Sequence, residues 1–257
     1  MPELPEVETL CRQLRRKISG GKILDSKIYD QKLTGIKNLK GCVVSAVERR
    51  GKTITIFLAE GPCALIHLRM TGRFFWQKDS SRPKHSRWMM TFKDGHVFLV
   101  DPRRFATVNV QKATPEKIQN DLITGFDEKA FLEKHAGRRV NIKNLLMDPR
   151  AIAGIGNIYV CEILHRAGIS PLKSALDLSG EEWKKIFTNA RRILKKAIEK
   201  RGTSISDWRD LYGRKGENQH ELKAYGRDGK RCLVCGGSIR RIKQGGRSTF
   251  YCPDCQT

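Results

Sequence analysis

The stretch "CLVCGGSIRRIKQGGRSTFYCPDC" at residues 232–255 decides the fold of one end of this 257-residue chain. Its cysteines form a C-x2-C-x16-C-x2-C pattern. That spacing lets four thiolates surround one tetrahedral zinc ion, and the residues between the two pairs predict a β-hairpin with glycines at its turns. The predicted ligands of one structural zinc ion are Cys232, Cys235, Cys252 and Cys255.

Two disulfides are the alternative interpretation of these cysteines. The other cysteines lie singly within apolar patterns, which is typical of reduced thiols in a reducing compartment and favours the metal. They are Cys11, Cys42, Cys63 and Cys161. Because a ribbon of this size is held together mainly by its metal, we expect the ion to position the basic hairpin that carries Arg247.

The charge of the whole chain predicts a polyanionic partner. Lys and Arg number 50 against 27 Asp and Glu, which gives a formal net charge of +23. Nucleic acid is the expected partner, although charge alone leaves a ribosomal-type or membrane-surface protein as alternatives. No apolar run approaches the ~18 residues that span a bilayer and no targeting segment is recognisable. We therefore expect no membrane contact and a cytoplasmic location.

The hydrophobic pattern changes near the middle of the chain. Apolar residues alternate from residue 22 to 112, which predicts a β-sandwich, and "KATPEKIQNDLITG" at 112–125 lacks a period and predicts a linker. Helical spacing follows, as at 183–198. The fold class is therefore α+β with two domains. The predicted boundaries are 1–112 for the N-terminal catalytic β-sandwich, 113–125 for the linker, 126–220 for the helical DNA-binding domain and 221–257 for the zinc finger.

A glycine-rich turn in the helical half could hold an anion. "AGIGN" at 153–157 lets backbone N–H groups at the start of the next helix approach a phosphate, with the Asn157 side chain as a further donor. Glycines of this kind also end ordinary helices, so that alternative stays open.

The first ten residues, "MPELPEVETL", combine a helix start with a possible nucleophile. Pro5 suits the first turn of a helix, and Glu6 favours its positive end. Pro2 and Glu3 precede that helix. Removal of the initiator methionine would make Pro2 a secondary amine; an α-amino group, with a pKa of about 7.7 to 8.0, is partly unprotonated near neutral pH. Such an amine could form a Schiff base with a sugar carbon.

Five motifs carry a family resemblance: "PELPEVET" at 2–9, "HLRMTG" at 67–72, "DPRRF" at 101–105, "AGIGNIY" at 153–159 and the cysteine-rich C-terminal hairpin. In this order they resemble the bacterial formamidopyrimidine-DNA glycosylase family, which is related to endonuclease VIII. The resemblance spans nearly the whole chain. It implies an N-terminal β-sandwich, a helix-two-turns-helix module and a zinc finger.

The activity that this resemblance implies is that of a bifunctional DNA glycosylase and AP lyase of base excision repair. Such an enzyme flips and excises oxidised purines, namely formamidopyrimidines and 8-oxoguanine opposite cytosine, and then nicks the strand by β,δ-elimination. The implied partner is double-stranded DNA containing an oxidised base. The protein is expected to be a monomer that associates with the nucleoid.

The resemblance also assigns catalytic roles. Pro2 would be the Schiff-base nucleophile at C1′, Glu3 the proton donor that helps to open the sugar, and Glu6 a support for both. Lys52, in "RRGKTITIF", would serve β-elimination, and Arg247 δ-elimination. Both cations also make sense as phosphate clamps, because a guanidinium is a poor proton donor.

Further residues would bind DNA. Asn157 would hold the kinked backbone, and Met70, Arg103 and Phe105 would fill the gap left by the flipped base, with Arg103 bonding the estranged cytosine. Core packing is the alternative for Met70 and Phe105. The remaining implied DNA contacts are His67, His85 and Arg138.

The chain departs from the family pattern at two positions. "KHSR" at 84–87 stands where the family often has Lys-His-Asp-His, so Arg87 alters the local network. Asn218 precedes Gln219 where members that bind 8-oxoguanine usually have an aromatic residue. We therefore expect a more mobile capping loop and faster excision of formamidopyrimidine than of 8-oxoguanine.

Two other functions compete with this one. An endonuclease VIII-like glycosylase would prefer oxidised pyrimidines, but Arg103 suits a cytosine opposite a damaged guanine. A noncatalytic zinc-ribbon DNA-binding protein would leave Pro2 and Glu3 incidental, and retention of Met1 would favour it.

Overall fold

The computed structural model describes residues 1–257 except 34–37, 60 and 113–119, and the chain divides into two compact units. The first unit comprises Met1–Lys117 and Ile198–Gln219, and the second comprises Ile118–Ala197 and His220–Thr257. The domain boundaries expected from the sequence stay a prediction. Of the predicted linker, residues 113–119 lie outside the described part.

Helix α1 (Leu4–Ile18) opens the first unit with Pro5 in its first turn. Glu6 reaches back so that its Oε2 accepts the backbone N–H of Glu3 at 2.8 Å, which satisfies a donor that the helix itself cannot pair. The apolar stripe recurs every three or four residues and is wholly buried. It consists of Val7, Leu10, Cys11, Leu14 and Ile18.

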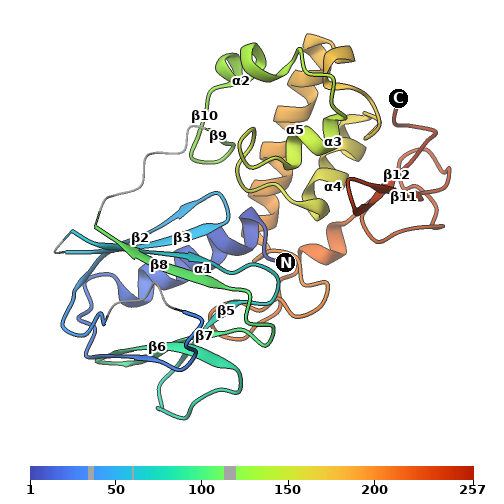
Figure 1. The fold of residues 1–257 in the computed structure, drawn as a ribbon. Coiled ribbons are helices and arrows are strands. Elements are labelled where there is room, and N and C mark those ends of the chain that lie inside the picture. The colour runs from blue at the N-terminus through green and yellow to red at the C-terminus, as the bar shows by residue number, and fades with distance from the viewer. Residues whose placement is uncertain (34–37, 60, 113–119) are drawn as a thin grey trace. The chain divides into compact units, whose positions relative to one another are not determined.

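After α1, the strands of the first unit form two antiparallel sheets, as the alternating pattern predicts (Figure 1). One four-stranded sheet has the order β2-β3-β4-β8, with the strands Val44–Arg50, Thr53–Leu58, Cys63–His67 and Thr107–Gln111. The other has the order β1-β6-β7-β5, with the strands Asp25–Ile28, Ser86–Phe92, Gly95–Val100 and Arg73–Gln77. Both sheets and α1 contribute to one apolar core, so the predicted sandwich is confirmed.

The segment 198–219 completes that core, although it lies far from it in sequence. Trp208 and Leu211 are buried in the same apolar cluster as α1 and the two sheets. The backbone of Leu211 is fixed on both sides: its carbonyl accepts the N–H of Trp76 at 2.9 Å, and its N–H donates to Gln13 Oε1 at 2.9 Å. The first unit therefore needs both of its segments.

The second unit is mainly helical, as the spacing after residue 125 predicts (Figure 1). Its helices are α2 (Glu128–His135), α3 (Ile142–Met147), α4 (Asn157–Ala167), the 3-10 turn η1 (Ala175–Asp177) and most of α5 (Gly180–Glu199). A short pair of strands precedes them, β9 (Asn120–Asp121) and β10 (Gly125–Phe126). Phe131 packs edge to face on Trp183 and Phe187, so α2 and α5 share an aromatic core.

Near its C-terminus the chain forms the predicted hairpin. After the 3-10 turn η2 (Asn218–Glu221), β11 (Arg240–Gln244) pairs antiparallel with β12 (Arg247–Tyr251). Gly245 and Gly246 form the turn with φ of 55° and 75°, a region that favours glycine. The hairpin packs on α4 through β12.

Candidate active site and zinc centre

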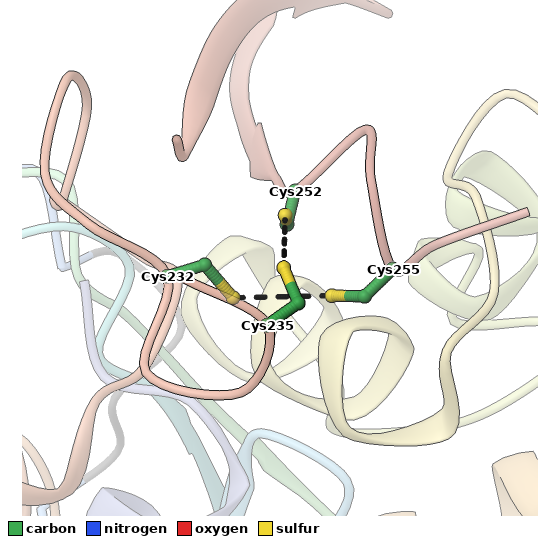
Figure 2. Close-up of side chains that lie close together, drawn as sticks. All are labelled: Cys232, Cys235, Cys252 and Cys255. Atoms are coloured by element: carbon green, nitrogen blue, oxygen red, sulfur yellow. Dashed lines mark hydrogen bonds between the residues drawn. The ribbon is translucent and has the colours of Figure 1, made fainter. Parts of the chain in front are cut away.

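The four predicted zinc ligands come together at the base of the hairpin (Figure 2). Their sulfurs all lie within 4.8 Å of one another. Cys232 and Cys255 are 3.8 Å apart and Cys235 and Cys252 are 3.4 Å apart, far beyond a disulfide bond, and all eight cysteines are free thiols. A tetrahedral zinc with bonds of about 2.3 Å needs sulfurs about 3.8 Å apart. The donor set therefore fits one zinc ion, and the disulfide alternative is wrong.

His165 of α4 makes a hydrogen bond to one cysteine of this cluster. Its Nε2 lies 3.3 Å from Cys232 Sγ, and its side chain is buried. Burial alone would raise the pKa of Cys232, but hydrogen bonds from the Cys235 backbone and from His165 outweigh it and lower the pKa to about 6. A thiol with that pKa is largely thiolate at neutral pH, the form that binds metal. This contact could not be predicted from the sequence, because a lone histidine on an apolar helix face is usually a packing residue.

Asn157 and the hairpin lie together. Asn157 is the first residue of α4, and its Nδ2 donates to the Ser248 carbonyl at 2.8 Å. Its Oδ1 is buried and has no hydrogen-bond partner among the described residues. Arg247, next to Ser248 in the chain, is exposed. Two of the predicted site residues of this unit are thus neighbours.

A fully buried lysine also lies beside the hairpin. Lys143 of α3 donates from Nζ to Thr249 Oγ1 at 2.7 Å. Burial lowers the pKa of Lys143. The sequence did not single it out, because lysines on short helices normally face water. Arg138, in contrast, is exposed after α2, with Nη1 3.5 Å from His135 Nδ1.

In the first unit, Glu6 connects the N-terminal segment to the segment after α5. Its Oε2 binds the Glu3 N–H, and its Oε1 accepts the N–H of Thr203 at 2.7 Å. Gly202 has a φ of 79°, and a Cβ there would lie 2.6 Å from Glu6 Oε1, so only glycine fits. Pro2, Glu3 and Glu6 are all buried. Glu6 therefore holds Glu3, the residue directly before α1 and next to Pro2.

The segment with Asn218 is held more firmly than expected. Asn218 is buried, donates its N–H to the Gly202 carbonyl at 3.0 Å and donates from Nδ2 to Thr203 Oγ1 at 2.8 Å. The Gln219 side chain accepts from the Ser204 N–H and donates to the Gly216 carbonyl. These hydrogen bonds anchor Asn218, and the expected mobility of the loop stays a prediction. Hydrogen bonds take the place of an aromatic anchor.

Met70 and Phe105 are not core residues. They are 44% and 48% exposed, on the connections from β4 to β5 and from β7 to β8, so the core-packing alternative is wrong. Arg103 is exposed too, and its guanidinium lies 4.7 Å from the centre of the Phe105 ring. Thr71 Oγ1 donates to Asp101 Oδ1 at 2.5 Å and ties the two connections together.

Lys52 lies in the turn directly before β3, and His67 is the last residue of the adjacent strand β4. Lys52 directly precedes Thr53, which pairs with His67 across β3 and β4. His67 Nδ1 accepts the N–H of Arg69 at 3.0 Å. Burial first, and then the charges of Arg69 and Lys52, lower the pKa of His67 to about 4, so its imidazole is neutral at physiological pH. His85 is exposed before β6, with a φ of 64°.

Comparison with known proteins assigns the chain. Residues 1–108 match the family described as "Formamidopyrimidine-DNA glycosylase N-terminal domain", and residues 118–208 match its "H2TH domain". Residues 229–257 match the "Zinc finger found in FPG and IleRS". The chain belongs to the formamidopyrimidine-DNA glycosylase family. It is therefore a DNA glycosylase of base excision repair, and enzymes of this family are also AP lyases.

Relatives match this family member along its whole length. The formamidopyrimidine-DNA glycosylases of Desulfitobacterium hafniense and Carboxydothermus hydrogenoformans are 36% and 38% identical over 274 and 268 residues, with both chains fully covered. A Lactococcus lactis FPG mutant, solved with a Fapy-dG containing DNA, aligns with a TM-score of 0.92 at 34% identity over all of both chains. Lactococcus lactis Fpg with an abasic site containing DNA aligns at 0.91, also at 34% identity, over 99% of each chain. These matches favour the formamidopyrimidine-DNA glycosylase assignment over both competing functions.

No helix in the described ranges is both long enough and apolar enough to cross a membrane.

Proposed function

We propose that this glycosylase excises oxidised purines, formamidopyrimidines and 8-oxoguanine opposite cytosine, from double-stranded DNA and then nicks the strand by β,δ-elimination. The observation that carries the proposal is the full-length match to formamidopyrimidine-DNA glycosylases, together with a buried Pro2-Glu3 segment held by Glu6. We further propose that it acts as a monomer on chromosomal DNA in the cytoplasm.

The N-terminal residues perform the first step in this proposal. After removal of Met1, the nitrogen of Pro2 bonds to C1′ of the damaged nucleotide as the bond from C1′ to the base breaks. Glu3 gives a proton to the sugar ring oxygen, and the ring opens to an iminium ion. The hydrogen bonds of Glu6 to Glu3 and Thr203 support this role, because they restrict the motion of the residue next to the nucleophile.

Elimination then cuts the strand. Loss of the C2′ proton expels the 3′-phosphate, and loss of the C4′ proton expels the 5′-phosphate. We assign Lys52 to the first elimination and Arg247 to the second, each as a fixed cation that stabilises the departing phosphate, while the two protons pass to water. His67 lies beside Lys52 as a neutral imidazole, so it does not add a competing charge there.

The remaining residues hold the DNA. Asn157 contacts the kinked backbone, and its amide group has a second Nδ2 hydrogen to donate besides the one bound to the Ser248 carbonyl. Met70, Arg103 and Phe105 enter the gap, with Arg103 reading cytosine, and their exposure supports this role. Arg138 and His85 add outer contacts. Zinc, held by the four cysteines, supplies a structural cross-link that fixes the hairpin with Arg247.

Borohydride trapping tests the chemistry. The protein is incubated with DNA that contains one 8-oxoguanine opposite cytosine and is reduced, and the cross-linked peptide is sequenced by mass spectrometry. We expect the DNA on the peptide that begins with Pro2, and severe loss of trapping in Pro2→Gly. A cross-link at an internal lysine would show that another amine is the nucleophile.

Single-turnover excision tests the substrate class. Rates are compared for formamidopyrimidine, 8-oxoguanine and an oxidised pyrimidine in the same duplex. We expect both purine lesions to be removed faster. A preference for the pyrimidine would support the endonuclease VIII-like alternative instead.

A further inference from the structure

The connections that carry Met70, Arg103 and Phe105 include strained backbone. Arg69 on the β4–β5 connection and Arg104 on the β7–β8 connection have φ of 56° and 58°, in the left-handed region that non-glycine residues rarely adopt. His85, on the neighbouring β5–β6 connection, has φ of 64°. Such conformations persist only where the surroundings fix them. The strained Arg104 and the two connections are held by contacts that centre on one buried arginine, Arg87.

Arg87 is on β6 and is 3% exposed. Its Nε donates to Asp30 Oδ2 at 2.6 Å, and its Nη1 donates to the Ala106 carbonyl at 2.6 Å. Nη1 also lies 3.5 Å from Asp101 Oδ2. The planar guanidinium can make these contacts at the same time because its donors diverge in a fixed fork, and an ammonium or an imidazole cannot.

Asp101 transfers this constraint to both connections. Buried at 1% exposure, it accepts the Thr71 hydroxyl beside Met70. It also accepts the N–H groups of Arg103 at 3.2 Å and Ala106 at 2.7 Å, one on each side of Phe105. The two connections are thus fastened to a single carboxylate that Arg87 neutralises.

Asp30 holds the strained Arg104 directly. It accepts Nε of Arg104 at 2.9 Å and Nη2 at 2.5 Å, in addition to Arg87. Arg104 lies between Arg103 and Phe105, so its orientation decides where both neighbours point. The contacts of Asp30, Arg87 and Asp101 therefore reach both the β4–β5 and the β7–β8 connection.

We propose that Arg87 is a positioning residue that holds Met70, Arg103 and Phe105 in the arrangement that fills the gap beside a flipped base. It does not touch DNA and acts through Asp101 and Asp30. The role of these three side chains in filling the gap rests on the proposed function. The arginine that replaces the histidine of the family pattern thereby gains a role in opposite-base discrimination.

The test compares Arg87→Met and Arg87→Lys with the wild type on two substrates. Excision of 8-oxoguanine opposite cytosine and opposite adenine measures discrimination, and cleavage of a preformed abasic site measures chemistry without a base to flip. We expect Arg87→Met to lower the cytosine preference by about 5-fold or more, the lower range for a bidentate base contact, and to leave abasic cleavage within about 2-fold. Arg87→Lys should recover part of the preference, because it keeps the charge but not the fork.

Arg49→Lys is the matched control. Arg49 is another buried arginine of the first unit that binds a carboxylate, Glu8, and a backbone carbonyl, that of Gly51. It should show a comparable loss of thermal stability with unchanged opposite-base preference. A folded Arg87→Met with wild-type preference overturns the proposal.

Two further measurements decide the case in which Arg87→Met does not fold or the wild type is inactive. Thr71→Val removes only the bond to Asp101 and should slow excision opposite every base; an unchanged rate overturns the proposal. Amide exchange in Arg87→Lys should be faster at 101–106 than in the wild type, whatever the activity, and equal exchange also overturns it. A wild type that cleaves neither substrate contradicts the proposed function alone.

Discussion

At the scale of single residues, Arg103 and Met70 lie on linked connections, but their replacement by alanine should change excision in different ways. Arg103→Ala should reduce discrimination between cytosine and adenine opposite the lesion by about 1 to 3 kcal/mol, or roughly 5- to 150-fold, because a base-specific bidentate contact is lost. Met70→Ala should slow excision opposite every base. Single-turnover rates against all four opposite bases separate the two outcomes, and preserved discrimination in Arg103→Ala would mean that another residue reads the cytosine.

His67 gives a prediction about stability and pH. Its pKa is lowered to about 4 in the folded state from an unfolded value of 6.5, so the unfolded chain binds the proton more readily. Stability that depends on neutral His67 is therefore present above pH 6.5 and is lost as the pH falls towards 4. His67→Gln should flatten the dependence of melting temperature on pH in this window, as thermal unfolding can measure. Identical slopes for both proteins would contradict the shift.

Single residues also show where sequence analysis reaches its limit. The four cysteines could be assigned as zinc ligands because their spacing is tied to one geometry. Arg87, His165 and Thr203 could not be recognised, since each acts through a partner at least 50 positions away. The role of such a residue depends on which strands and helices meet, and that information is not local.

At the scale of elements, α4 is fastened to the hairpin region at three levels. Asn157 at its start binds Ser248, and Glu162 in its middle accepts the N–H groups of residues 223 to 225. His165 near its end contacts Cys232. A change at the zinc cluster can therefore reach Asn157 through one rigid helix and one short strand.

Zinc removal should disrupt this arrangement while the first unit stays folded. Chelator treatment should unfold the hairpin, displace Arg247 and abolish DNA binding, as followed by zinc release and by binding to labelled duplex. His165→Ala should release zinc to the chelator faster, because a hydrogen bond to one thiolate is lost. Arg166→Ala, at the exposed next position, is the control. DNA affinity that is indifferent to the chelator would contradict a structural zinc.

The segment around Asn218 should influence lesion preference through its anchor. Asn218→Ala breaks the bond to Thr203 at a cost of about 1 kcal/mol and should widen the advantage of formamidopyrimidine over 8-oxoguanine, which depends more on loop closure. Asn218→Phe should narrow the gap if the ring can enter this buried position. Single-turnover rates for both lesions opposite cytosine decide this. Equal rates in the wild type and in Asn218→Ala would mean that the loop does not set the preference.

Element types were predictable because periodicity is local. The alternation at Ile54 and Ile56 became β3, and the spacing from Trp183 to Ile198 became α5. The order of strands within each sheet was not predictable, since β1 pairs with β6 and β4 with β8 across long stretches of chain.

At the scale of the whole molecule, the net charge of +23 makes DNA binding an electrostatic reaction. Each neutralised phosphate contributes about −0.9 to the slope of log affinity against log salt, so roughly four contacts give about −3.6. Titration of a labelled abasic duplex at several salt concentrations measures the slope. Lys52→Gln should make it shallower by about one contact, and an unchanged slope would show that Lys52 does not bind phosphate.

The division into units was the feature least accessible from sequence. A contiguous first domain is the simplest interpretation of one change in periodicity near residue 112. The structure instead returns Ile198–Gln219 to the first unit, because Trp208 and Leu211 fit its core and Thr203 binds Glu6.

Because the first unit combines residues far apart in sequence, it cannot complete its core early in synthesis on the ribosome. When residue 117 has been translated, the β-sandwich still lacks Trp208 and Leu211, and the segment around Glu3 still lacks Thr203. The 102 residues from 118 to 219 take about 5 to 20 s to add at bacterial elongation rates of roughly 5 to 20 residues per second. During that interval the nascent N-terminal unit lacks part of its core, so we expect it to expose apolar surface. For the same reason, residues 1–117 alone cannot be moved into another protein as a complete domain.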